Sequence, residues 1–206
     1  MIYYRLKKYL DDRIEVIPLE LAGRAGRHKE SFYPTFEDAV YDLSQRVEKN
    51  IGPEDSFAIF GHSMGSWLAF EINHLLQKEG KRLPFHLILS GRWAPHIKKA
   101  NQVDISLPEK EFMEQVLELG GTPKEVLEDE ELRNIFLPIF KEDLRLLENY
   151  SFTEQREPLT SDFSVFTGIG DSYISQRDLS EWSRLTNGMT KVYKFKGDHF
   201  FINSGI

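Results

Sequence analysis

Apolar residues recur at the spacing of a helix face in separate parts of the chain. Over residues 35–50 the recurring positions are Phe36, Ala39, Val40, Leu43 and Val47, which predicts an amphipathic helix. A second helix is expected over residues 63–80, where the segment "SMGSWLAFEINHLLQKEG" ends at Gly80. A shorter helix is expected around residues 176–185. Each of these helices should pack one face against a core.

Short apolar runs between the helices predict β-strands. They are "EVIPLEL" (15–21), "SFAIFG" (56–61), "FHLILSG" (85–91), "DFSVFTG" (162–168) and "TKVYKFKG" (190–197). Strands that alternate with helices in this way build a mostly parallel sheet with helices on both faces. The expected fold class is therefore α/β, in one domain that spans residues 1–206.

The strand pattern is interrupted between residues 104 and 157. Ser106 and Glu109 have the spacing of a capping box at the start of one helix. A long helix with a kink at Pro138 is expected over residues 129–150. Because no run in this interval has the pattern of a strand, we interpret it as a helical insertion that sits on the sheet.

Composition and charge narrow the classes of function. The 206 residues carry a formal net charge of −7 and include no cysteine, so this sequence offers no disulfide, thiolate or cysteine-based metal site. Without a long basic run, binding to nucleic acid is not expected. The sequence shows no signal peptide and no membrane-spanning run, which together with the lack of cysteine favours a cytoplasmic protein and argues against a membrane partner. No metal-ligand spacing is present, so we expect no metal.

The segment "IFGHSMGSWLAF" places one serine between a predicted strand and a predicted helix. Its centre, "GHSMG", has the form of a nucleophile elbow, a turn so tight that the flanking Gly61 and Gly65 must be small. We therefore predict Ser63 as the nucleophile, held in a strained conformation with its hydroxyl exposed. The N–H of Met64 at the helix start is the predicted oxyanion donor. His62 is interpreted as local structure.

A serine nucleophile needs a base and an orienting carboxylate, which follow the serine in the order acid, histidine in this architecture. His199 lies just past the last predicted strand and is the expected base. Asp171 lies at the carboxyl end of its strand and is the expected acid, with Asp178 second. Asp162 lies at the wrong end of that strand, and Asp198 is adjacent to the histidine. The weaker candidates for the base are His28, His62, His74, His86 and His96.

Two further patterns favour ordinary loop structure. The segment "GIGDSY" (168–173) has half of a dinucleotide-binding fingerprint but lacks its third glycine, so a strand-end turn is the better interpretation. The basic segment "GRAGRHK" (23–29) is typical of a solvated loop, although it could attract an anion. Neither pattern predicts a bound cofactor.

Several segments together resemble one protein family. They are "EVIPLELAGRAGRHKESFYPTFEDAV", "FGHSMGSWLAFEI", "HLILSGRWAPH", "FKEDLRLLENY" and "KGDHFFI". In this order they resemble the type II thioesterases that accompany nonribosomal peptide and polyketide synthetases, including the related chain-releasing thioesterases of fatty acid synthesis. The resemblance covers nearly the whole chain. It implies an α/β-hydrolase fold with a helical lid over residues 104–157.

The resemblance also implies a reaction, the hydrolysis of acyl or aminoacyl groups from the phosphopantetheine arm of carrier proteins. The family's nucleophile, acid and base map onto Ser63, Asp171 and His199. The expected partners are therefore acyl or peptidyl carrier domains of a synthetase, and no cofactor of the protein's own is implied. The implied role is editing, which clears misprimed or stalled acyl groups. We expect the enzyme to be a monomer.

The chain departs from the family pattern at both ends. Family members begin with an apolar strand and a Gly-rich loop before a helix like "YYRLKKYLDD", and they continue past "FINSGI" into a terminal helix. In α/β-hydrolases that first strand lies beside the nucleophile strand, and its loop supplies a second oxyanion donor. We therefore expect either lower activity than in a longer version, or a rearranged sheet in which "EVIPLEL" moves beside "SFAIFG". A general serine esterase or acyltransferase and a non-catalytic carrier-binding relative remain open as alternatives.

Overall fold

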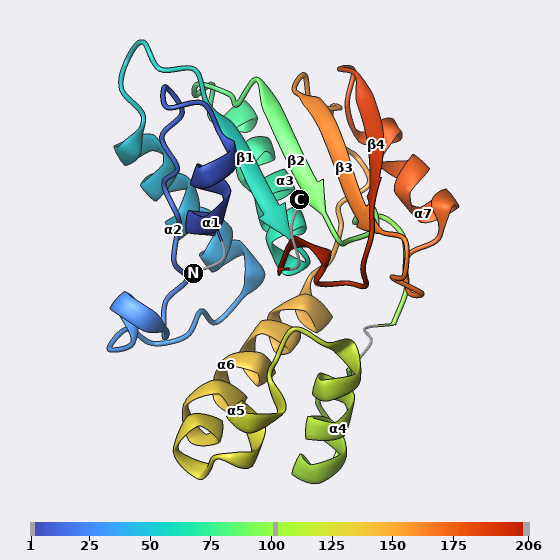
Figure 1. The fold of residues 1–206 in the computed structure, drawn as a ribbon. Helices are drawn as coiled ribbons and strands as arrows, with labels where there is room; N and C mark the ends of the chain where they lie inside the picture. The colour runs from blue at the N-terminus through green and yellow to red at the C-terminus, as the bar shows by residue number, and fades with distance from the viewer. Residues whose placement is uncertain (1–2, 101–102, 204–206) are drawn as a thin grey trace.

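The computed structural model describes residues 3–100 and 103–203, and a four-stranded sheet forms its centre (Figure 1). The strands are β1 (Ala58–His62), β2 (His86–Ser90), β3 (Asp162–Gly168) and β4 (Thr190–Phe195). They lie in the order β1-β2-β3-β4, and every neighbouring pair is parallel. The parallel sheet and the last four predicted strands are thus confirmed.

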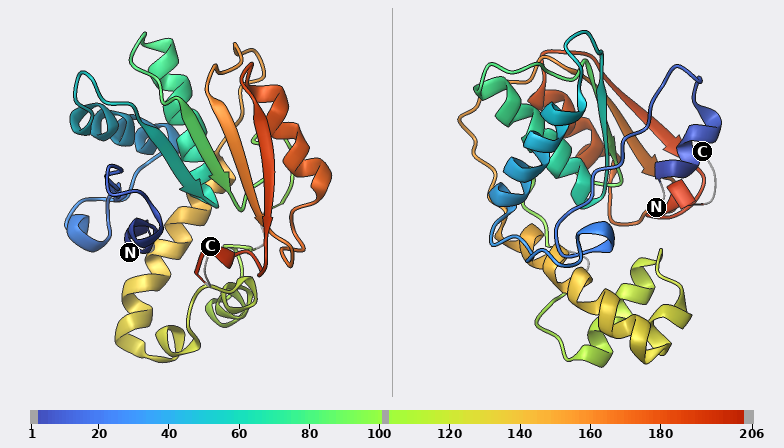
Figure 2. Two further views of the ribbon diagram at one scale, coloured as in Figure 1. Left: turned by 45° about the horizontal axis from the view of Figure 1, so that its top comes forward. Right: turned by 90° about the vertical axis from the view of Figure 1, so that its left-hand side faces the viewer.

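Helices cover both faces of the sheet. α2 (Phe36–Asn50) and α3 (Met64–Lys78) lie on one face, while the short α1 (Tyr3–Leu6) lies on the other (Figure 2). None of the helices in the described part of the chain combines the length and the apolar character needed to cross a bilayer. The remaining short elements of this body are η1 (Lys7–Tyr9), η2 (Ala25–Arg27), α7 (Gln176–Ser180), η3 (Glu181–Leu185) and η4 (Phe201–Asn203).

The long helices of the body form where the apolar periodicity predicts them. Before α2, the hydroxyl of Thr35 accepts the N–H of Asp38 at 3.1 Å, and the Asp38 carboxylate accepts the N–H of Thr35 at 3.1 Å. This reciprocal capping satisfies N–H groups that a helix start leaves open. After α3, Gly80 adopts φ +65°, a conformation that favours glycine and ends the helix.

The prediction of a first strand over residues 15–21 is wrong. This segment forms no strand and pairs with none of the described strands, and β1 lies at an edge of the sheet. Pro18 in its middle has no N–H to donate, and a strand exists only where a neighbour completes its hydrogen bonds. The expected rearrangement, in which this segment pairs beside β1, is therefore not observed.

Residues 104–157 form a helical layer away from the sheet, which we call the lid (Figure 1). Its helices are α4 (Glu109–Leu119), α5 (Lys124–Glu128) and α6 (Glu130–Asn149), and the described residues of this interval form no strand. Pro138 lies inside α6, which continues through it. The lid helices share a small core made by Val103, Phe112, Val116, Leu127 and Leu137.

The predicted capping box of α4 is wrong. Ser106 donates its hydroxyl to Asp104 at 2.6 Å, and Pro108 occupies the N-cap position without a side-chain hydrogen bond. Because Asp104 is only two residues away, this local bond competes successfully with the helix start for the serine hydroxyl.

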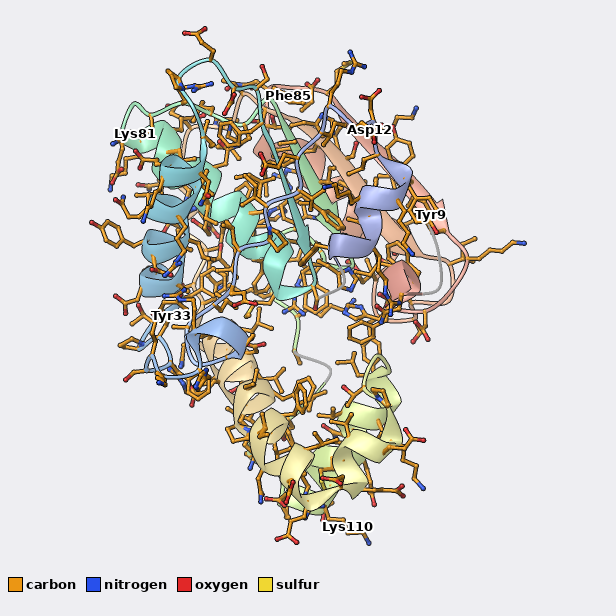
Figure 3. All side chains as sticks on the ribbon, turned by 60° about the vertical axis from the view of Figure 1, so that its left-hand side comes forward. Tyr9, Asp12, Tyr33, Lys81, Phe85 and Lys110 are labelled. Atoms are coloured by element: carbon orange, nitrogen blue, oxygen red, sulfur yellow. The ribbon has the colours of Figure 1, made fainter. Side chains whose placement is uncertain are left out.

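The carboxyl-terminal half of α6 ties the lid to the body. Arg24 donates two hydrogen bonds to the carboxylate of Asp143, at 2.8 and 2.6 Å. Arg145 donates to the backbone carbonyls of Tyr33 and Pro34, in the loop that lies beside α6 (Figure 3). The lid is thus held by charge-assisted bonds as well as by apolar packing.

The prediction of a solvated basic loop at residues 23–29 is wrong for its two arginines. Arg24 is bound to Asp143, and Arg27 pairs with Glu30 and Asp42. Because carboxylates neutralise both guanidinium groups, the two arginines form ion pairs within the protein and are not simply solvated.

The Arg24–Asp143 contact predicts a measurable coupling between lid and body. Both side chains are largely shielded from solvent and the contact is bidentate, so a double-mutant cycle of Arg24→Gln and Asp143→Asn should yield a coupling of about 1 kcal/mol in urea denaturation. The solvent-exposed pair of Arg13 and Asp11, changed in the same way, is the control and should show no measurable coupling. Equal couplings for the two pairs would contradict the anchoring role.

Candidate active site

The turn between β1 and α3 carries Ser63 in a strained conformation. Ser63 has φ 53° and ψ −120°. A non-glycine residue in such a region costs about 1–3 kcal/mol. A Cβ on Gly61 would lie 1.9 Å from the carbonyl oxygen of Gly65, so only glycine at position 61 lets the turn close. The strand-to-helix turn predicted for "GHSMG" is therefore present.

Gly65 plays a different part from Gly61. A Cβ at position 65 would meet only the hydroxyl oxygen of Tyr3, at 3.8 Å, which is an ordinary contact distance. The prediction that positions 61 and 65 must both be small is thus wrong for position 65. The backbone carbonyl of Gly65 lies close to Gly61, but a side chain on Gly65 itself would meet no close neighbour.

Ser90, at the end of β2, secures the turn from the neighbouring strand. Its carbonyl accepts the N–H of Ser63 at 2.8 Å, and its own N–H donates to the hydroxyl oxygen of Ser66 at 2.9 Å. That hydroxyl also lies 2.9 Å from the carbonyl oxygen of Gly61. Since Ser66 and Ser90 are fully buried, this network joins β1, β2 and α3 where water does not compete.

The predicted serine, histidine and aspartate come together at the carboxyl edge of the sheet. His199 Nε2 lies 3.1 Å from Ser63 Oγ, and His199 Nδ1 lies 2.8 Å from Asp171 Oδ2. With its proton on Nδ1, His199 donates to the carboxylate and leaves Nε2 free to accept the serine proton. The histidine and the aspartate are only 6% and 7% exposed, so their bond is shielded from solvent.

Two glycines, one at the end of β3 and one two residues later, let the chain before the histidine pass close to the aspartate. A Cβ on Gly168 would lie 2.1 Å from the carbonyl oxygen of Asp198. The N–H of Gly170 donates to the carbonyl of Gly197 at 2.8 Å. The segment "GIGDSY" is thus a strand-end turn, as predicted, and its glycines bring the acid and the base together.

The other candidates for acid and base make structural bonds elsewhere. Asp162 accepts a backbone N–H from the segment before β4, and Asp198 accepts the N–H two residues after it. Asp178 caps α7 and pairs with Lys99. The histidines that lie away from the site, bonded or packed in other places, are His28, His74, His86 and His96.

Arg92 is a neighbour of the site that the sequence analysis missed. Its guanidinium carbon lies 4.3 Å from the Trp67 ring centroid and 4.0 Å from that of Trp93. Burial lowers the pKa of Arg92 to about 9, and the charge of Asp171 opposes that shift. The available signal was "GRWAP", an arginine directly after a strand end.

The lid reaches the histidine loop through the turn that follows α4. Gly120 and Gly121 have φ +83° and +78°. A Cβ on Gly121 would lie 2.5 Å from Cδ2 of Phe200, and one on Gly120 would lie 3.8 Å from the carboxylate of Asp198. Without side chains at this turn, the lid packs directly on the residues that flank His199.

A cavity of about 950 Å³ lies between the end of α6 and the loop after β2. Its walls include Trp67, which lies one turn beyond Ser63 on α3, and the aromatic residues Tyr150 and Phe152. Charged residues, among them Lys98, Lys99 and Glu148, line the cavity beside these aromatic side chains, so its walls are of mixed polarity.

A parallel sheet with a serine at a strand-to-helix elbow, and an aspartate and a histidine after later strands, defines the α/β-hydrolase class. The solved structure of ClbQ from the colibactin NRPS/PKS pathway matches with a TM-score of 0.91 and 37% identity, over 98% of this chain and 85% of that one. The chain belongs to the thioesterase domain family, whose model matches residues 1–206.

Named relatives agree with this assignment. The chain is 32% identical over 206 residues to the linear gramicidin dehydrogenase LgrE of Brevibacillus parabrevis. That alignment covers 98% of this chain and 77% of LgrE. It is 33% identical over 199 residues to the medium-chain S-acyl fatty acid synthase thioesterase of Rattus norvegicus, over 94% of this chain and 73% of that protein. The family and fold implied by the sequence resemblance are therefore confirmed.

The two glycines of the elbow should respond differently to alanine. Gly61→Ala should cost more than about 3 kcal/mol of unfolding free energy or prevent folding, because its Cβ meets backbone. Gly65→Ala should leave stability unchanged or raise it, since alanine favours a helix over glycine by up to about 1 kcal/mol. Urea denaturation of both variants checks this, and similar losses in the two would refute it.

Proposed function

We propose that this chain is a serine thioesterase that hydrolyses acyl or aminoacyl thioesters from the phosphopantetheine arms of carrier proteins. The observation that carries the proposal is the continuous chain of hydrogen bonds from Ser63 through His199 to Asp171. The hydroxyl sits at an elbow, the base has one nitrogen turned to it, and the carboxylate orients the base. Family membership supplies the thioester as the bond to be cleaved.

In the first half-reaction, Ser63 Oγ attacks the thioester carbonyl while His199 Nε2 takes the hydroxyl proton. The carbonyl oxygen becomes negative, and the N–H of Met64 donates to it. Met64 is the first residue of α3, so its N–H has no acceptor within the helix. When the intermediate collapses, the C–S bond breaks and His199 returns the proton to the departing thiolate.

In the second half-reaction, water attacks the acyl group on Ser63. His199 takes a proton from that water and returns it to the serine oxygen, which releases the carboxylic acid. In both steps Asp171 accepts the Nδ1 hydrogen of His199, keeps the ring in the productive tautomer and stabilises the imidazolium.

The cavity near α3 has Trp67 in its wall, one helical turn after Ser63, which places it within reach of a substrate bound at the serine. Because the lid packs on the histidine loop, we expect it to admit only thioesters that are carried on a long, thin arm. For the biological role we infer editing of a nonribosomal peptide or polyketide synthetase. ClbQ comes from a pathway of this kind, and LgrE carries the name of linear gramicidin, which supports that role.

Other readings of the fold receive less support. A general serine esterase or an acyltransferase would use the same three residues, so the choice of substrate separates it from a carrier-directed enzyme. A non-catalytic relative has no need for bonding distances between Ser63, His199 and Asp171. A dehydrogenase, as in the name of LgrE, would need a phosphate-binding loop, but backbone from Gly197 and Asp198 fills the space over the "GIG" segment.

Replacing the nucleophile should abolish turnover without unfolding the protein. Ser63→Ala should lower the rate of thioester hydrolysis by at least about 10⁴-fold. Its urea midpoint should stay close to that of the wild type, because alanine and serine adopt the same backbone conformation at position 63. A serine-directed phosphonate should add once to the wild type, on Ser63, as seen by intact-mass and peptide mass spectrometry. Retained activity, or labelling at another residue, would refute the assignment.

The carrier should matter as much as the acyl group. The same acyl group should be hydrolysed with a higher kcat/KM from a carrier protein than from a short thiol, because remote contacts position the thioester at Ser63. The lid should govern this preference. The matching oxygen ester serves as a third substrate that identifies a general esterase. Equal specificity constants for carrier and short thiol would remove the support for an editing role.

A further inference from the structure

A second imidazole lies against the proposed catalytic base. His62, the residue before Ser63, has its ring centroid 5.2 Å from that of His199. The rings of Phe200 and Phe201 lie 5.7 and 6.0 Å from the His62 ring, on the segment that continues from the base. The base therefore has an aromatic neighbour on the strand that carries the nucleophile.

The His62 ring is anchored through one nitrogen. Its Nδ1 lies 2.9 Å from the hydroxyl oxygen of Ser90, while its Nε2 is buried without a hydrogen-bond partner among the described residues. The chain also leaves room for the two rings at Gly91, which has φ +64°. A Cβ there would lie 2.7 Å from Cε1 of His62 and 3.4 Å from Cε1 of His199. One glycine thus accommodates both imidazoles.

The His62 ring is uncharged in the range where the enzyme would work. Burial, followed by the charge of His199, lowers the pKa of His62 to about 3. The titratable groups that face it are His199 and Tyr3, and burial raises the pKa of Tyr3. On the far side of His199 lies Asp171, which interacts electrostatically with Arg92. A neutral ring does not repel the imidazolium that forms on the base during acyl transfer.

We propose that His62 is a positioning residue, whose ring, anchored by Ser90, holds the imidazole of His199 at bonding distance from Ser63. This inference rests on the proposed function of the three residues Ser63, His199 and Asp171. It assigns a role to the variable position of the "GHSMG" segment, which the sequence analysis treated as local structure.

The test separates the ring from its anchor. His62→Phe keeps a ring but loses the bond to Ser90, and Ser90→Ala keeps the imidazole but removes its partner. Each should lower kcat by up to about 10²-fold, since a misplaced catalytic group can cost that much, while KM stays nearly unchanged. The double variant should be no slower than the worse single variant, because both changes remove one interaction.

A matched control exists in the same sheet. His86 Nε2 lies 2.8 Å from the hydroxyl oxygen of Ser164, which is a histidine–serine pair between β2 and β3 at the opposite end of the strands. His86→Phe and Ser164→Ala should therefore leave kcat unchanged. Urea midpoints of both sets show whether the substitutions weaken the fold to a similar degree.

A second readout does not depend on the substrate. The rate at which the phosphonate adds to Ser63 should fall in parallel with kcat in the His62→Phe and Ser90→Ala variants. The acid limb of the pH profile for this reaction should keep its midpoint, because His62 carries no charge there to remove.

The outcomes are distinct. Wild-type rates of phosphonylation in both variants, or fully additive losses in the double variant, would overturn the positioning role. Equal losses in the His86 and Ser164 control pair would also overturn it. If the wild type reacts with the phosphonate but hydrolyses no thioester, the proposed function fails, and the phosphonylation rates still decide the role of His62.

Discussion

The close approach of strand β1 to helix α3 is the constraint on which the site depends. The α-carbon of Gly61 lies against the carbonyl of Gly65, so the chain must reverse within a single residue, and Ser63 takes the unfavourable backbone angles that result. Ser66 and Ser90 fasten this corner to the next strand with buried hydrogen bonds. The strain of one residue is thereby balanced by bonds spread over three elements.

Elements with a strong local signal could be predicted from the sequence. The helical spacing of apolar residues gave α2 almost to the residue, and β3 matches its predicted bounds, residues 162–168, because turn-forming residues flank a short apolar run. Asp171 and His199 could be selected because parallel strands bring their carboxyl ends to one edge. The close approach of the candidate residues Ser63, Asp171 and His199 could therefore be predicted from the strand order.

Features that depend on distant partners could not be predicted in the same way. Residues 15–21 have the composition of a strand, but composition does not supply the neighbour that a strand requires. The carboxylate that pairs with Arg24 lies 119 residues further along the chain. Gly65 and Gly61 look equivalent in the motif, and only coordinates distinguish a backbone contact from open space. Arg92 follows a strand end in the sequence, but only the coordinates place its guanidinium against the rings of Trp67 and Trp93.

Helix α6 contributes to two cores at once, since Leu137 packs in the lid and Leu146 packs in the body. Swinging the whole helix outward would expose apolar surface of the body, at about 25 cal/mol per Å². The turn after α4 meets the body at Gly121, whose α-carbon lies against the ring of Phe200. Because Phe112 of α4 and Leu127 of α5 pack with Leu137 in the lid core, a displacement of α6 would open the lid core and the body core together.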